Sequence, residues 1–126
     1  MKRTAAAVIL LSFAVFLSLW SGYVFRREMS SLLYSVEEII DCAETEPDII
    51  LIKKTGDLLR KWEKSSVILH SLVMHEGIDE LEENITALPI IIEHSDREEF
   101  KKKCIEAISR IENLLNAEKV RTENIL

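Results

Sequence analysis

Residues that interrupt helices are scarce in this chain: three glycines and two prolines occur in 126 residues. There is no glycine-rich segment of the kind that holds phosphate groups. No serine, threonine or cysteine stands in a recognisable arrangement with a base and an orienting group, which catalysis by a nucleophile needs. We therefore expect a non-enzymatic protein without a cofactor.

Cysteine is rarer still, since Cys42 and Cys104 are the only two. No metal-binding or redox spacing joins them. A disulfide between them is permitted if this part of the chain lies outside the cytoplasm. The alternative of two buried free thiols is the one we favour.

Positive charge is in deficit over most of the chain. The whole sequence has 16 Lys and Arg against 22 Asp and Glu, and four of the basic residues but none of the acidic ones lie in residues 1–27. Residues 28–126 therefore have a net charge of −10. Nucleic-acid binding needs a basic patch that displaces counterions, so we expect no nucleic-acid partner.

The chain does contain one long apolar run, residues 5–25, with Lys2 and Arg3 before it and Arg26 and Arg27 after it. Its 21 residues would form a helix of roughly 32 Å, which matches the hydrocarbon thickness of a bilayer. The sequence therefore predicts a membrane anchor in residues 1–27, contacting the lipid bilayer through residues 5–25, and a separate body in residues 28–126.

A cleaved signal peptide is the alternative interpretation of the same run. Cleavage sites favour small side chains at positions −3 and −1. Leu19 and Trp20 would occupy position −3 for cuts after Ser21 and Gly22 respectively, and both are too large. We therefore favour an uncleaved signal anchor, with Trp20 and Tyr23 near the membrane interface.

The flanking charges predict the orientation of this anchor. Lys2, Arg3 and the terminal amine stand on one side, against Arg26 and Arg27 on the other, so the positive-inside rule slightly favours an N-terminus inside the cell. We expect a single-pass protein of the cell membrane whose body is extracytoplasmic.

The body is predicted to be all-α, because apolar residues recur at intervals of three and four throughout it. Short connections favour a small antiparallel helical bundle or paired helical hairpins. The first helix should continue the transmembrane helix without a break. The expected helices cover about 28–44, 47–64, 66–94 with a kink near Pro89, and 96–117, followed by a tail at 118–126.

Local signals refine this pattern. Ser95 and Glu98 match a capping box, in which the Ser95 hydroxyl accepts from the Glu98 amide. Trp62 and Phe100 are expected to anchor the core. Ser65 and Ser66 either start a new helix or lie within a continuous one, and the sequence does not distinguish the two.

Three short motifs give the chain a resemblance to a known family. They are Leu59-x-x-Trp62, the segment His75-Glu76-Gly77-Ile78-Asp79 with Leu81 and Glu82 after it, and the closing Glu123-Asn124-Ile125-Leu126. With these motifs the chain resembles the small, N-terminally membrane-anchored helical proteins of bacteria known as domain of unknown function 4363. The resemblance implies a fold and a topology, but no activity.

The segment His75-Glu76-x-x-Asp79 is the one candidate for chemistry, because residues four apart share a helix face. It partly matches the H-E-x-x-H zinc motif, with Asp79 in place of the second histidine and no identified third ligand, although His70 and His94 exist. The alternatives are an ion pair between His75 and Asp79, or an interaction patch of Trp62, His75, Glu76 and Asp79. We favour no metal site here.

The function that fits these features best is a protein-interaction or scaffold module at the membrane surface. Its partner would be another envelope protein or a second copy of the chain. A small-ligand-binding, sensor-like bundle is an alternative, although the chain shows no further span to pass on a signal. A metal-dependent hydrolase using His75, Glu76 and Asp79 is the least favoured.

Overall fold

Four helices form the protein, which is described here by a computed structural model covering residues 1–72 and 76–125. The helices are α1 (Lys2–Cys42), α2 (Asp48–Leu72), α3 (Glu76–Glu93) and α4 (Arg97–Ile125). The described residues contain no β-strand. The predicted all-α class is confirmed.

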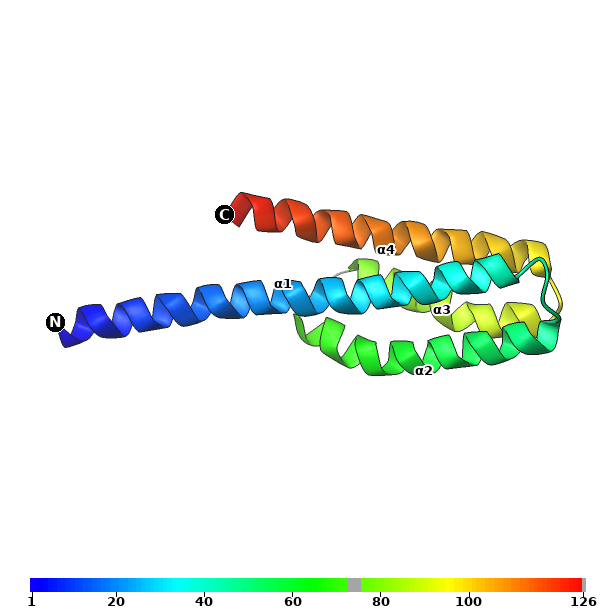
Figure 1. The fold of residues 1–126 in the computed structure, drawn as a ribbon, viewed down its shortest axis with the longest axis horizontal. Coiled ribbons are helices and arrows are strands. Elements are labelled where there is room, and N and C mark those ends of the chain that lie inside the picture. The colour runs from blue at the N-terminus through cyan, green and yellow to red at the C-terminus, as the bar shows by residue number, and fades with distance from the viewer. Residues whose placement is uncertain (73–75, 126) are drawn as a thin grey trace.

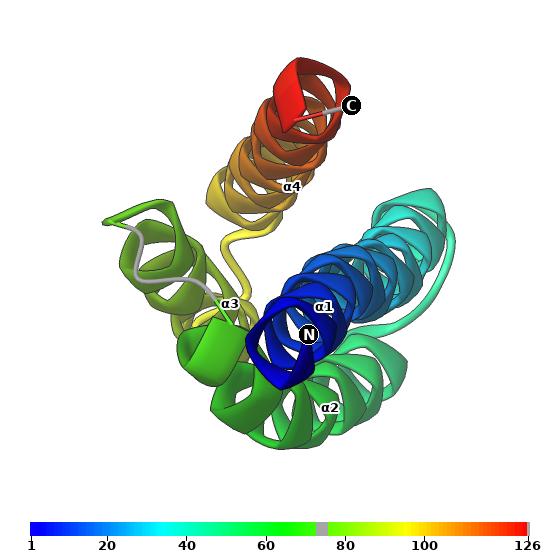
Figure 2. The same ribbon diagram turned by 90° about the vertical axis from the view of Figure 1, so that its left-hand side faces the viewer.

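The helices run alternately up and down, and each packs against two neighbours (Figures 1 and 2). The contacting pairs are α1 with α2, α2 with α3, α3 with α4, and α4 with α1, whereas the diagonal pairs do not meet. This is an antiparallel four-helix bundle. The N-terminal part of α1 projects beyond the other three helices, on the side where α4 ends (Figure 1).

The core is built from the apolar stripe of each helix, as the spacing of three and four predicts. Trp62 and Phe100 are buried within it, which confirms both as core anchors. The other large, fully buried side chains are Met29, Leu32, Leu51, Leu69, Ile78, Leu81, Ile85, Leu88, Ile92 and Ile111.

Helix α1 is continuous over 41 residues and ends at Cys42, close to the predicted end at residue 44. Its buried positions begin only at Gly22 and then recur at Phe25, Met29, Leu32, Val36 and Ile39. One helix therefore serves first as an exposed apolar rod and then as a member of the bundle.

The boundaries predicted at residues 64 and 66 are wrong, because α2 passes through Ser65 and Ser66 and ends at Leu72. Both hydroxyls are used without capping a helix: Ser65 Oγ donates to Glu28 Oε2 of α1 at 2.6 Å, and Ser66 Oγ donates to the Glu63 carbonyl at 3.1 Å. Of the two alternatives left open for these serines, the continuous helix is the one observed, and α3 begins at Glu76.

Helix α3 contains Pro89 and still continues to Glu93. Proline removes one backbone donor, at a cost of about 3 kcal/mol in a helix interior. Leu88 and Ile92 on either side of it are fully buried. Their packing offsets that cost, so the helix does not end before the proline.

The tail predicted at residues 118–126 is also wrong, because α4 continues to Ile125. Tertiary contact explains the extension. Glu118 is 6% exposed and lies against Gly22 of α1, so the last turns of α4 are supported by the neighbouring helix.

The capping box predicted at Ser95 does not form, and the cap lies one residue later. Ser95 has a left-handed backbone with a φ of 56°, and its hydroxyl donates to Asp48 Oδ2 at 2.8 Å. The Asp96 carboxylate accepts the Glu99 amide at 3.2 Å and thus caps α4. The Ser95 side chain instead joins the α3–α4 connection to the first residue of α2.

Candidate functional site: the exposed segment of α1 and its junction with the bundle

The N-terminal half of α1 is the first candidate for a functional feature of the molecule. It is the one helix in the described part of the chain that is long and apolar enough to cross a membrane. Its side chains are exposed as far as Trp20, apart from half-buried Ser18. The large apolar ones are Val8, Ile9, Leu10, Leu11, Phe13, Val15, Phe16, Leu17, Leu19 and Trp20.

The junction with the bundle is at Gly22, inside the predicted span of residues 5–25. A Cβ atom at Gly22 would lie 3.0 Å from Glu118 Oε1, so the glycine allows α4 to approach α1 closely. Glu118 in turn accepts from Arg121 Nη2 at 2.9 Å. The apolar run thus passes from an exposed part, which ends at Trp20 and includes half-buried Ser18, to a part with buried positions from Gly22.

The opposite end of the bundle is fastened by Arg97, the first residue of α4. Its guanidinium donates to the Ala43 carbonyl at 2.6 Å, the Glu46 carbonyl at 2.7 Å and Asp48 Oδ1 at 2.7 Å. The Ala43 carbonyl follows the end of α1 and has no helical partner of its own. One side chain therefore joins the α1–α2 connection to the start of α4.

The carboxylates near this end are held in their ionised form. The hydrogen bond from Ser95, assisted by Arg97, lowers the pKa of Asp48 below its usual value. The hydrogen bond and charge of Lys101 lower the pKa of Glu44 in the same way. Both contacts join the α1–α2 connection to α4, so they add pH sensitivity to that junction.

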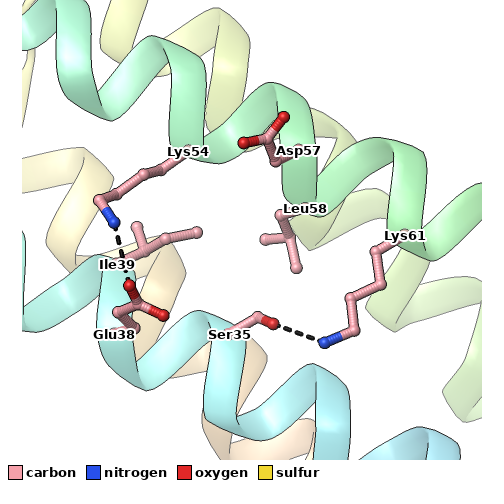
Figure 3. Close-up of a pocket in the computed structure, with 7 residues that line it drawn as sticks. All are labelled: Ser35, Glu38, Ile39, Lys54, Asp57, Leu58 and Lys61. Carbon is pink, nitrogen blue, oxygen red and sulfur yellow. Dashed lines mark hydrogen bonds and ion pairs between the residues drawn. The ribbon is translucent and has the colours of Figure 1, made fainter.

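A cleft of about 180 Å³ lies between α1 and α2 (Figure 3). Its polar groups are paired across it: Lys54 Nζ donates to Glu38 at 3.0 Å, and Lys61 Nζ donates to Ser35 Oγ at 2.7 Å. The hydrogen bond and charge of Glu38 raise the pKa of Lys54. The paired charges tie the two helices together.

Ser35 and Lys61 resemble a serine–lysine nucleophile pair in distance only. Lys61 also donates to the Ser31 carbonyl at 2.9 Å, so its amine bridges two oxygen acceptors of α1. The surrounding backbone amides belong to helices and are not free to stabilise an oxyanion. The arrangement therefore fits structural cross-bridging and not acyl transfer.

Comparison with known families identifies one that matches most of this chain. Residues 25–125 match the family described as Domain of unknown function (DUF4363). The chain belongs to the DUF4363 family. The predicted resemblance is thus confirmed, and no curated protein or solved structure matches the chain.

The matched segment of the DUF4363 family coincides with the bundle. It begins at Phe25, the first large side chain of α1 that is buried, and ends at the last residue of α4. The exposed apolar part of α1 precedes the match. Family membership therefore describes the helical body and leaves the role of that segment to be argued from its own chemistry.

Of the predicted patch of Trp62, His75, Glu76 and Asp79 in this DUF4363 chain, the structure describes the side chains of Trp62 and Asp79. Trp62 is 1% exposed, and its indole Nε1 donates to Glu82 Oε1 at 3.3 Å, so it has no surface to offer a partner. Asp79 is exposed on α3. His75 and the Glu76 side chain lie outside the described residues.

Asp79 does meet other groups that can ligate a metal. The ligand atoms of His70, Asp79 and Glu82 all lie within 4.8 Å of one another. His70 comes from the end of α2, whereas the two carboxylates come from the start of α3. The spacing of residues within one helix identifies Asp79 as a candidate ligand but does not identify His70. His70 lies on a different helix, and only the antiparallel pairing of α2 and α3 brings it close to Asp79.

Both cysteines of the DUF4363 chain are free thiols in the structure. Cys104 is fully buried on α4, and this burial raises its pKa to about 12. Such a thiol stays protonated at neutral pH and is a poor nucleophile. Cys42 is partly exposed at the end of α1.

Proposed function

We propose that this protein is a single-pass membrane-anchored helical module, which holds its bundle directly at the membrane surface to bind another protein. The observation that supports the proposal most strongly is the continuity of α1. The same helix provides an exposed apolar segment and then the buried stripe from Gly22 to Ile39, with no linker between the two. Because a continuous helix is rigid, the orientation of the bundle relative to the bilayer would be fixed.

The packing at Gly22 shortens the membrane segment to residues 5–21 at most. These 17 residues give roughly 25 Å of helix, at the lower end of the lengths that span a bilayer. Glu118 and Arg121 lie level with the end of this segment. Charged groups are costly inside hydrocarbon, so the last turns of α4 would lie among the lipid headgroups.

The proposed orientation places the N-terminus inside the cell and the body outside. Lys2 and Arg3 with the terminal amine slightly outnumber Arg26 and Arg27. An impermeant thiol reagent tests this proposal in intact cells through a cysteine introduced at exposed Tyr34. Labelling supports an outside body, and protection until the cells are broken contradicts it.

A protein-binding role without catalysis suits the surface of the bundle. The cleft of about 180 Å³ is below the usual 300–1,000 Å³ of small-molecule sites, and its charged side chains already hold hydrogen-bond partners. Large apolar side chains are exposed instead on all four helices, at Tyr34, Ile49, Ile90 and Ile105. The charge of −10 over residues 28–126 disfavours contact between copies and favours a partner with a basic surface.

Anchoring is tested by the intact mass of the chain purified from membranes. The proposal predicts that residues 1–24 are retained and that the chain stays in the membrane pellet after alkaline carbonate extraction. A mature chain that starts near Gly22, or release by carbonate, contradicts anchoring and supports a cleaved signal sequence.

Partner binding is tested by a photocrosslinking residue at Tyr34 or Ile105, with Glu112 on the exposed polar face of α4 as the matched control position. We expect one heterologous adduct from the apolar positions, weakened by high salt, and none from position 112. A dimer of this chain would identify a second copy as the partner and contradict the basic partner. Adducts at none of the positions would contradict the interaction role.

A further inference from the structure

The facing ends of α2 and α3 bring three metal-ligating side chains together outside any feature used so far. The imidazole of His70 and the carboxylates of Asp79 and Glu82 have ligand atoms within 4.8 Å of one another. His70 and Asp79 are exposed, and Glu82 is half-buried. All three stand on helices, so the backbone fixes their relative positions.

The geometry suits a small cation. Asp79 and Glu82 are three residues apart on α3 and therefore share one face of that helix. His70 approaches the same face from α2, which runs antiparallel to α3. Ligands bound to one zinc ion stand about 2.0–2.2 Å from the metal, so small rotations of exposed side chains would close the set around it.

A buried contact already orients one of the three ligands. Trp62 Nε1 donates to Glu82 Oε1 at 3.3 Å, which leaves the second carboxylate oxygen free to ligate. Hydrogen bonds of this kind from a rigid neighbour fix ligating carboxylates in metal sites. Trp62 is 1% exposed, so packing fixes the position of its indole. The hydrogen bond from this indole therefore restricts the orientation of the Glu82 carboxylate.

We propose that His70, Asp79 and Glu82 bind one divalent transition-metal ion of the zinc class. An imidazole ligand favours Zn²⁺ over Mg²⁺ and Ca²⁺, which prefer sets made of oxygen alone. Two carboxylates and a neutral imidazole balance the charge of the ion. Three protein ligands leave a fourth position open to water or to a ligand from outside.

The bound ion would join the last turn of α2 to the first turns of α3. These ends of α2 and α3 lie at the end of the bundle from which the exposed part of α1 projects (Figure 1). The opposite end is already fastened by Arg97. Metal binding would thus fasten the second end of the bundle, and this proposal does not depend on membrane anchoring.

The test uses the full chain in detergent micelles, stripped of metal with a chelator and titrated with ZnCl2 by calorimetry. We expect one equivalent of Zn²⁺ to bind and Mg²⁺ at the same concentration to have no effect. His70→Ala and Asp79→Asn should each weaken binding by more than about tenfold, since even the loss of an outer-shell partner costs that much. His94→Ala is the matched control, because His94 lies at the other end of the bundle.

A second readout follows from Trp62. In a Trp20→Phe background Trp62 is the only tryptophan, so Zn²⁺ at Glu82 should change its fluorescence with the same midpoint as the calorimetric binding. Loss of this response in Glu82→Gln supports the site. No zinc binding, or binding that is equal in His70→Ala and in the unsubstituted chain, would overturn it and reduce any metal uptake to attraction by the acidic surface.

Discussion

At the scale of single residues, Arg97 connects more of the chain than any sequence signal suggests. Its guanidinium binds two backbone carbonyls and one carboxylate of the α1–α2 connection. Hydrogen bonds to a charged group contribute about 1.5–3 kcal/mol each before solvent exposure is counted. The side chain is about one-third exposed, which reduces this value.

Replacement Arg97→Ala should therefore lower the free energy of unfolding by about 2 kcal/mol. Arg60→Ala is the matched control, because Arg60 pairs only with the exposed Asp57 one turn away; it should change stability by less than about 0.5 kcal/mol. Thermal unfolding by circular dichroism measures both. Equal effects of the two substitutions would contradict the role of Arg97.

Two glycines make a second comparison at this scale. No atom lies within 4 Å of a Cβ built on Gly56, so Gly56→Ala should stabilise α2 by about 0.5–1 kcal/mol. A Cβ built on Gly77 would lie 2.8 Å from Leu114 Cδ2. Gly77→Ala should therefore stabilise the protein less than Gly56→Ala does, or destabilise it. The effect of Gly77→Ala should become more favourable in a Leu114→Ala background. A gain at Gly77 as large as at Gly56 would disprove the close contact.

Cysteine reactivity gives a third test at this scale. Because the Cys104 thiol has a pKa of about 12 and is buried, an alkylating reagent at neutral pH should modify Cys42 in the folded chain and Cys104 only after unfolding. Mass spectrometry of the modified chain identifies the site. Early modification of Cys104 would show that the core of the bundle does not cover it.

At the scale of elements, the connections should make the bundle sensitive to acid. The pKa values of Glu44, Asp48 and Glu106 are lowered in the folded chain, chiefly by hydrogen bonds from Lys101, Ser95 and Lys103 respectively. A carboxylate of lowered pKa stabilises the folded state above its unfolded pKa. That stability is lost as pH falls through the lower folded value.

The free energy of unfolding should therefore be constant from neutral pH to about pH 5. It should decrease once the pH drops below the reference pKa values of 4.5 for Glu and 3.8 for Asp. Asp48→Asn should lower the melting temperature at neutral pH and flatten this acid decline. Melting temperatures recorded from neutral pH to about pH 3 provide the measurement. An acid decline of unchanged slope in Asp48→Asn would exclude Asp48 as a source.

The elements also show what the sequence can predict. The apolar stripes give the four-helix pattern and the core, because burial of each stripe decides the helix and its register. Several helix ends were mispredicted because tertiary contacts set them: Ser65 bonds Glu28 and Ser95 bonds Asp48 instead of capping a helix. In the candidate metal site, Asp79 follows from local spacing, whereas His70 requires knowledge of how α2 and α3 pair.

At the scale of the whole molecule, the central feature is one helix with two environments. Residues of α1 are exposed as far as Leu17, Ser18 and Ser21 are half-buried, and the fully buried positions begin at Gly22. Because no linker separates the two parts, a bilayer around residues 5–21 would hold the bundle upright on its surface. The acidic body and the chain end of α4 would then face the headgroups and solvent.

The most direct test measures depth along α1 by electron paramagnetic resonance in lipid vesicles. Single spin labels are placed at Phe16, Tyr23 and Tyr34, all exposed on this helix, in a Cys42→Ala background where buried Cys104 does not react. We expect the label at 16 to be accessible to oxygen and not to a water-soluble nickel reagent, the label at 34 to show the reverse, and the label at 23 to be intermediate. Equal access of the nickel reagent to 16 and 34 would contradict the anchor and the placement of the bundle at the membrane surface.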